Sequence, residues 1–262
     1  MEVESLMIDS PTAGRDEVGV LLKAMSLLVT LAEGSLTVVQ LSKRTGVSKP
    51  GVYRILKTLD KGGFVVRDAI RKEYSLGPAF IGLGRATHSS SGLIRAVRPS
   101  LREIHEKYNE TVNLGVLSHG RIIYLDTIES RQRLRVTVPI TMQDNFHATA
   151  LGKAILSAMP DDLALETINE TALSKRTKNT LVTLEELLAA TKKGKELGYA
   201  IDNEEDEIGF RCVAAPILNS KNFPVAAISV TAPTSRLSAE DFVEIGNHLK
   251  KVCAALRKTI TS

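Results

Sequence analysis

The chain has 262 residues, 43% of them hydrophobic, and a formal net charge of +4. This length suits two domains with cores of their own. The longest apolar stretch, residues 18–31, is broken by Lys23 and is too short to cross a bilayer, and no basic-then-apolar secretory start opens the chain. We therefore expect a cytoplasmic protein with no membrane partner.

The cysteines and histidines predict neither a metal site nor a cofactor. Both cysteines are expected as reduced thiols, because nothing argues for export. His248 and Cys253 are the closest Cys/His pair, and at five residues apart on a helix their side chains point about 140° away from each other. Spacing of this kind does not make a ligand pair.

Positive charge is concentrated near the N-terminus. Between residues 35 and 85, ten basic residues stand against three acidic ones, whereas the rest of the chain carries a net charge of −3. This asymmetry predicts a polyanionic partner for the first part of the chain only.

The N-terminal elements read as a mobile tail at residues 1–16, a helix at 17–33, and two helices joined by a tight turn at 37–61. Gly46 suits the positive φ of such a turn, and Ser48 suits the N-cap of the next helix, with Pro50 tolerated in its first turn. Six apolar side chains are expected to share one core: Leu41, Val47, Val52, Ile55, Leu56 and Leu59.

This pattern predicts a helix-turn-helix whose second helix enters the major groove of DNA. Residues 64–67 and 73–76 are predicted strands of a hairpin that forms a wing, although a solvated hairpin with ordinary surface charges is the simpler alternative. The candidate DNA-binding residues from these elements are Thr37, Ser48, Lys49, Tyr53, Arg54, Lys57, Arg71 and Lys72.

We assign residues 17–78 to this winged helix-turn-helix domain, 79–92 to a linker helix that ends in a serine-rich break, and 93–262 to a second domain. In the second domain, helical and alternating patterns follow one another and predict a mixed α+β fold. Predicted strands cover residues 112–116, 121–128, 134–140, 210–216 and 225–231, and predicted helices begin at residues 93, 150, 161, 183 and 238.

Three segments carry more specific motifs. They are GVSKPGVYRILKTLDKGGFV at residues 46–65, HATALGKAILS at 147–157, and GYAIDNEEDEIGFRCVAAPI at 198–217 followed by VAAISVTAP at 225–233. With these motifs the chain resembles transcriptional regulators of the IclR family from about residue 17 to residue 260.

The resemblance implies a winged helix-turn-helix, a linker helix and a C-terminal effector-binding domain of GAF-like fold. It also implies homodimers, often paired as dimers of dimers, that bind double-stranded DNA at a palindromic operator under the control of a small-molecule effector, such as a small organic or aromatic acid. The chain departs from the family at Pro50-Gly51, where small hydroxyl residues are usual.

The second domain offers a ligand site. Thr149 is expected to cap the helix that starts at residue 150, so that the amides of Leu151 and Gly152 face a carboxylate at a positive dipole end. Ser229 and Thr231 share one face of a strand. By resemblance, the effector-binding residues are Ala150, Leu151, Asp202, Cys212, Ser229 and Thr231, with Val136 and Phe210 as apolar walls.

Other interpretations stay open. Cys212, Ser229 and Thr231 are also ordinary residues for a buried strand, and the acidic run at residues 204–207 is more often a solvated loop than a metal cluster. An enzyme would need Cys212 as nucleophile with His147 as base and Asp202 to orient it, but burial in an apolar run raises the pKa of a thiol. An architectural DNA-binding protein would not need a second domain of roughly 170 residues.

Overall fold

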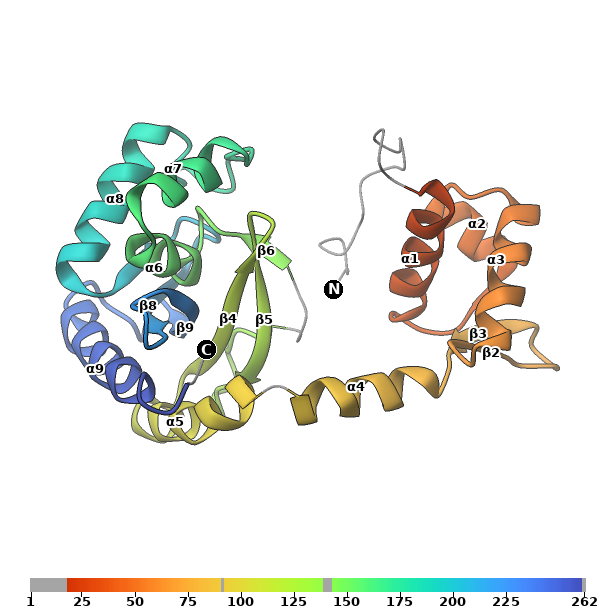
Figure 1. Ribbon diagram of the computed structural model, residues 1–262, viewed down its shortest axis with the longest axis horizontal. Coiled ribbons are helices and arrows are strands. Elements are labelled where there is room, and N and C mark those ends of the chain that lie inside the picture. Colours follow the sequence, from red (N-terminus) through yellow and green to blue (C-terminus); the bar gives the residue numbers. More distant parts are fainter. Residues whose placement is uncertain (1–17, 91, 139–142, 261–262) are drawn as a thin grey trace. The chain divides into compact units, whose positions relative to one another are not determined.

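The computed structural model describes residues 18–90, 92–138 and 143–260, so that the predicted tail at residues 1–16 lies outside the described residues. Contacts divide the chain after Ser90 into two compact units, coloured red to gold and yellow to blue in Figure 1. Each unit has its own hydrophobic core.

The N-terminal unit packs three helices around one core and closes it with a small antiparallel sheet in the order β1-β3-β2. All six predicted core side chains belong to this cluster, with Leu59 only partly buried. The strand β1 is not among the predicted ones, because two residues are too few for alternation to be recognised. The elements are α1 (Gly19–Leu31), β1 (Leu36–Thr37), α2 (Val38–Thr45), α3 (Lys49–Lys61), β2 (Val65–Arg67) and β3 (Glu73–Leu76).

The turn between α2 and α3 has the predicted chemistry. Gly46 adopts φ 70°, the left-handed conformation that ends α2, and Ser48 Oγ accepts a hydrogen bond from Gly51 N at 3.4 Å at the start of α3. Thr37 caps α2 in the same way and forms a capping box with Gln40. These caps fix where α3 begins and therefore which of its side chains face outward.

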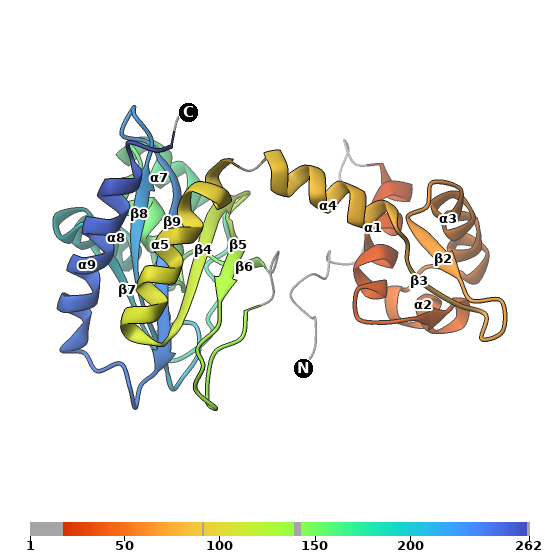
Figure 2. The same cartoon turned by 90° about the horizontal axis from the view of Figure 1, so that it is seen from below.

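The C-terminal unit is built on a six-stranded antiparallel sheet in the order β6-β5-β4-β9-β8-β7. Helices α5 and α9 cover one face and lie in front of the sheet in Figure 2, and α6, α7 and α8 cover the other face (Figure 1). A helix α4 (Ala79–Ser90) precedes this unit. The elements of the unit are α5 (Gly92–Tyr108), β4 (Thr111–Ser118), β5 (Arg121–Ile128), β6 (Gln143–Asn145), α6 (Ala150–Ala158), α7 (Asp161–Asn169), α8 (Leu184–Leu197), β7 (Ala200–Asn203), β8 (Phe210–Leu218), β9 (Pro224–Pro233) and α9 (Asp241–Leu256).

Strand alternation decides which side chains face each helical layer. On β4, Val112 and Leu114 pack toward α5 and α9, and Asn113 faces the opposite side beside its β9 partner Ser229. The polar side chains of β4, β8 and β9 are thereby gathered on the α6 face of the sheet.

The predicted strand at residues 134–140 is wrong over its described part, because residues 134–138 form no ladder; Ile140 lies outside the described residues. Side chains take the carbonyls that a partner strand would use: Arg236 Nη2 donates to Leu134 O at 2.8 Å, and Thr111 Oγ1 donates to Val136 O at 2.8 Å. The edge of β5 is instead paired with β6, whose three residues carry no recognisable alternation.

Helix α6 lies against the backbone of Phe146, and Gly152 makes this contact possible. A Cβ at Gly152 would overlap the carbonyl oxygen and Cα of Phe146, and backbone atoms cannot move aside as a flexible side chain does. The start of α6 is therefore held at a fixed distance from the strand that precedes it.

We expect Gly152→Ala to destabilise the C-terminal unit by about 3 kcal/mol or more, because the added methyl group must displace backbone. Thermal unfolding should show a midpoint lowered by roughly 6–12 °C. Gly82→Ala on α4, where nothing lies within 4 Å of the added Cβ, is the matched control and should leave the midpoint unchanged or higher. A Gly152→Ala midpoint equal to that of the control would contradict the close contact.

Candidate functional site

The outer face of α3 is polar and cationic. Val52, Ile55 and Leu56 are buried, which turns Tyr53, Arg54 and Lys57 outward, and Tyr53 is 51% exposed. Ser48 and Lys49 are exposed at the start of the same helix. In the part of the chain that the structure describes, the basic residues of this face, Lys49, Arg54 and Lys57, have no acidic partner within 4 Å, so their charges are available to an anion.

The loop between β2 and β3 presents a second cationic point. Arg71 and Lys72 are exposed there, and Lys72 adopts φ 58°. Asp68 Oδ1 accepts hydrogen bonds from Ile70 N at 2.8 Å and Arg71 N at 2.9 Å, which lower the pKa of Asp68 and fix the loop. Thr37 differs from the other predicted DNA-binding residues, because it is half-buried and its hydroxyl donates to Gln40 Oε1.

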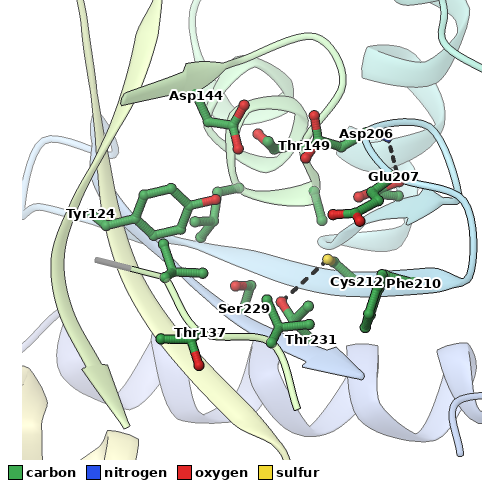
Figure 3. Close-up of a pocket in the computed structure, with 15 residues that line it drawn as sticks. Tyr124, Thr137, Asp144, Thr149, Asp206, Glu207, Phe210, Cys212, Ser229 and Thr231 are labelled. Carbon is green, nitrogen blue, oxygen red and sulfur yellow. Dashed lines mark hydrogen bonds between the residues drawn. The ribbon is translucent and has the colours of Figure 1, made fainter. Parts of the chain in front are cut away.

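The C-terminal unit contains a pocket of about 130 Å³ between α6 and the polar face of the sheet (Figure 3). The structure brings all eight predicted effector-binding residues together in its lining: Val136, Ala150, Leu151, Asp202, Phe210, Cys212, Ser229 and Thr231. A volume this size suits a small metabolite rather than a drug-sized ligand.

Hydroxyl groups and a thiol form the floor of the pocket. Asn113 Nδ2 donates to Ser229 Oγ and to Thr231 Oγ1, both at 3.3 Å, and Thr231 Oγ1 donates to Cys212 Sγ at 3.2 Å. Burial raises the pKa of the Cys212 thiol well above its usual value, so the group stays protonated. These neighbouring strands therefore present neutral polar groups to a ligand.

The start of α6 forms one wall. Thr149 Oγ1 accepts a hydrogen bond from Gly152 N at 3.1 Å, which confirms Thr149 as the cap. The prediction that Gly152 offers its amide to a ligand is wrong, because the cap already uses that amide. The amides of Ala150 and Leu151 are the first two of the helix and have no acceptor within it, so they are the ones left for an anion.

Carboxyl groups line another side of the pocket, and the sequence reasoning found only one of them. Asp144, Asp206 and Glu207 join the predicted Asp202 there. Burial, followed by repulsion from Asp206, raises the pKa of Asp144 to about 7, and burial raises the pKa of Asp202 to about 7. Asp144 was missed because it lies on the unpredicted strand β6. For Asp206 and Glu207, the run of acidic residues at 204–207 was the sequence feature that could have indicated a place in the pocket.

The acidic run at residues 204–207 is only partly the solvated loop that was predicted: Glu207 is exposed, but the other three side chains make contacts within the protein. Glu205 is buried and forms an ion pair with the buried Lys153 of α6. Glu204 accepts from Gly209 N at 2.9 Å, and Asp206 pairs with Arg176 Nε at 2.9 Å. The lysine inside the apolar segment ALGKAILS was the sequence signal for a buried acidic partner.

The Cys212–His147 pair that an enzyme would need does not form. His147 Nε2 lies 3.0 Å from the carbonyl oxygen of Ser174, and burial lowers the pKa of the imidazole. Cys212 instead accepts from Thr231. Within residues 18–90, 92–138 and 143–260 no three His, Cys, Asp or Glu side chains are grouped to hold a metal ion, and no helix there is long and apolar enough to cross a membrane.

Family models match both parts of the chain. The family model for the IclR helix-turn-helix domain matches residues 20–69, and the model described as bacterial transcriptional regulator IclR, C-terminal, matches residues 85–258. The first match contains α2 and α3, and the second contains every residue of the pocket lining.

Similar proteins are named as transcriptional regulators rather than enzymes. HTH-type transcriptional regulator KdgR of Escherichia coli K12 is 32% identical over 87% of this chain and 88% of its own, and transcriptional repressor IclR of the same organism is 32% identical over 90% and 87%.

Solved structures show the same fold. The Thermotoga maritima IclR structure has a TM-score of 0.77 at 27% identity, and covers 92% of this chain and 98% of its own. An IclR homolog of Microbacterium hydrocarbonoxydans complexed with 4-hydroxybenzoate has a TM-score of 0.74 at 19% identity, covering 90% and 98%. The chain therefore belongs to the IclR family of helix-turn-helix transcriptional regulators, with a C-terminal effector-binding domain.

Proposed function

We propose that this chain binds a palindromic operator as a homodimer in the cytoplasm and that a small organic acid in the pocket of the C-terminal unit controls this binding. The observation that carries the proposal is the presence, in one chain, of an unpaired cationic helix face and a separate pocket lined by polar and apolar groups. The boundaries proposed for the two functions are residues 17–78 for DNA binding, 79–92 for the linker, and 93–262 for effector binding.

Helix α3 is the proposed recognition helix. Arg54 and Lys57 stand one turn beyond its start, where a helix lying in the major groove meets base edges and phosphates. Arg71 and Lys72 at the hairpin tip add a second contact with the backbone of the duplex. Thr37 is a weaker contact in this proposal, since its hydroxyl already bonds Gln40.

The exposed apolar side chains of α1 and α4 support a dimer. Val20, Leu21 and Met25 on α1 and Ile81 on α4 are each more than half exposed. Side chains of this kind on two helices of one small unit favour burial against a second copy. A twofold dimer would present two copies of α3 to a palindrome, and a further pairing of dimers would use other surfaces.

The pocket suits a small organic acid at its α6 end, where the amides of Ala150 and Leu151 and the positive end of the helix dipole favour a carboxylate. The 4-hydroxybenzoate in the Microbacterium hydrocarbonoxydans homolog is an acid of this class. Control of DNA binding requires that the ligand stabilise one dimer geometry over another, and α4 is the proposed route for that difference.

We expect Arg54→Ala to weaken operator binding about tenfold, because one phosphate contact is lost. The slope of log affinity against log salt concentration should become smaller by about one. The measurement is fluorescence anisotropy over a salt series, with an operator selected from random duplex DNA. Lys192→Ala, an exposed lysine on α8, is the control of equal charge change. Unchanged affinity and slope for Arg54→Ala would remove this residue from the interface.

We expect at least one small carboxylic or phenolic acid to raise the unfolding midpoint, since a ligand at 100 times its Kd stabilises a protein by about 2.7 kcal/mol. Ser229→Ala should reduce that shift, because the hydroxyl lies in the pocket floor, whereas Ser235→Ala, an exposed serine of the same unit, should not. A normal shift in Ser229→Ala would place the ligand elsewhere. No shift with any acid, phenol or polyol would favour an architectural protein without an effector.

A further inference from the structure

The acidic groups of this pocket would repel a ligand that carries a carboxylate and no positive charge. Asp144, Asp202, Asp206 and Glu207 line it, and the lining contains no lysine, arginine or histidine. Figure 3 shows the carboxyl groups of Asp144 and Asp206 turned toward each other beside Thr149, at the start of α6. A carboxylate that occupies this helix end therefore lies among other carboxylates.

The cations nearest to this side of the pocket are already engaged. Arg176 pairs with Asp206 and is 45% exposed at its side chain, and Arg121 Nη1 donates to Asn145 Oδ1 at 2.8 Å. Lys153 is buried in its pair with Glu205. Arg121 and Arg176 act on Asp144, and Lys153 acts on Asp202, but none of these three side chains lines the pocket, so the pocket has room for a cation of the ligand.

A second feature points to a ligand independently of the acidic groups. Tyr124 is 94% buried, and its hydroxyl points into the pocket in Figure 3. Among the described residues, no group donates a hydrogen bond to this hydroxyl or accepts one from it. Burial raises the pKa of Tyr124 well above its usual value, so the phenol remains a donor. The unpartnered Tyr124 hydroxyl opens into the pocket, where a bound molecule can accept a hydrogen bond from it.

We propose that the ligand of this pocket is an organic acid that also carries a protonated amine, held with its carboxylate at the start of α6 and its ammonium group among Asp144, Asp206 and Glu207. This inference rests on the proposed effector function of the pocket and names the chemical class of the effector. Asp144 and Asp206 each accept one hydrogen bond from the protein, through Oδ1, so the ammonium can neutralise these carboxylates and donate to their other oxygens. The hydroxyl groups of Tyr124 and Ser229 meet the remainder of the ligand.

The pH dependence of binding separates this ligand from a plain acid. The pKa of Asp144, about 7, means that the group is largely protonated at pH 5.5 and ionised at pH 8. An ammonium ligand therefore binds more tightly at pH 8, whereas a plain acid binds more tightly at pH 5.5. The charged and titratable groups that face Asp144 are Arg121 and Tyr124 from β5, Arg176 from the segment after α7, and Asp202, Asp206 and Glu207 from the acidic loop.

The test uses pairs of acids that differ only in an amine or a hydroxyl group. The full chain is titrated calorimetrically with alanine and lactate, with the 4-amino and 4-hydroxy derivatives of butyrate, and with the 4-aminomethyl and 4-hydroxymethyl derivatives of benzoate. The expected result is that, in at least one pair, the amine binds tenfold or more tightly than its hydroxyl partner at pH 8, and that this preference shrinks at pH 5.5.

Two variants test whether Asp144 and Asp206 cause the preference for the amine over its hydroxyl partner. Asp144→Asn and Asp206→Asn should each reduce the amine-over-hydroxyl ratio about tenfold, because each removes a carboxylate of nearly unchanged shape. Glu196→Gln, which removes an exposed carboxylate of α8 outside the pocket, should leave the ratio unchanged. If either pocket variant fails to fold, the paired titration of the unaltered chain still decides the question.

Two outcomes would overturn the inference. In the first, hydroxy acids bind as tightly as the amines at pH 8 and more tightly at pH 5.5 than at pH 8. This result would show that the pocket accepts plain acids by taking up a proton, and the proposed effector function would stand. If no member of any pair binds, the inference fails. If neutral polyols, titrated in the same way, also fail to bind, the proposed effector role of the pocket fails as well.

Discussion

The buried ion pair between Lys153 and Glu205 sets the shape of the C-terminal unit around its pocket. Lys153 lies on α6 with 2% of its surface exposed, and Glu205 lies on the loop between β7 and β8. Burying two charges is costly unless they meet each other and have further hydrogen bonds, and the loop supplies these: Glu205 Oε1 accepts from Asn203 N, and the Glu205 carbonyl accepts from Thr180 Oγ1 at 2.7 Å. Loss of one partner would leave an uncompensated charge, at a cost of about 3–5 kcal/mol.

This pair brings the acidic loop to the start of α6 and thereby determines the chemistry of the pocket. With Glu205 held inward, Asp202 accepts from Glu205 N at 2.7 Å, and Asp206 lies opposite Asp144. The contact of Gly152 with Phe146 holds the same helix end from the other side. A helix terminus suited to an anion is thus surrounded by carboxyl groups, an arrangement that favours a ligand with charges of both signs.

Local chemistry in the sequence predicts much of this molecule. Gly46 and Ser48 mark the turn before α3, Thr149 marks the start of α6, and alternation in β8 and β9 places Cys212, Ser229 and Thr231 on one face. The family motifs then identify which of these polar residues share a pocket. Features that depend on contacts between distant segments were missed: Asp144 enters the lining through a three-residue edge strand, and the role of Glu205 depends on a lysine 52 residues away. The apolar alternation at residues 134–138 was misleading, because side chains from other elements satisfy that backbone.

The two units together make a regulator only if occupancy of the pocket changes operator binding. Ligand and DNA then compete or cooperate through a coupling free energy, which in proteins is typically about 1–3 kcal/mol. The most direct measurement is the affinity of the full chain for its selected operator, with and without a saturating concentration of a compound that raises the unfolding midpoint. We predict that the affinity changes fivefold or more, in either direction. Equal affinities in the two conditions, with the compound bound, would contradict ligand control of DNA binding.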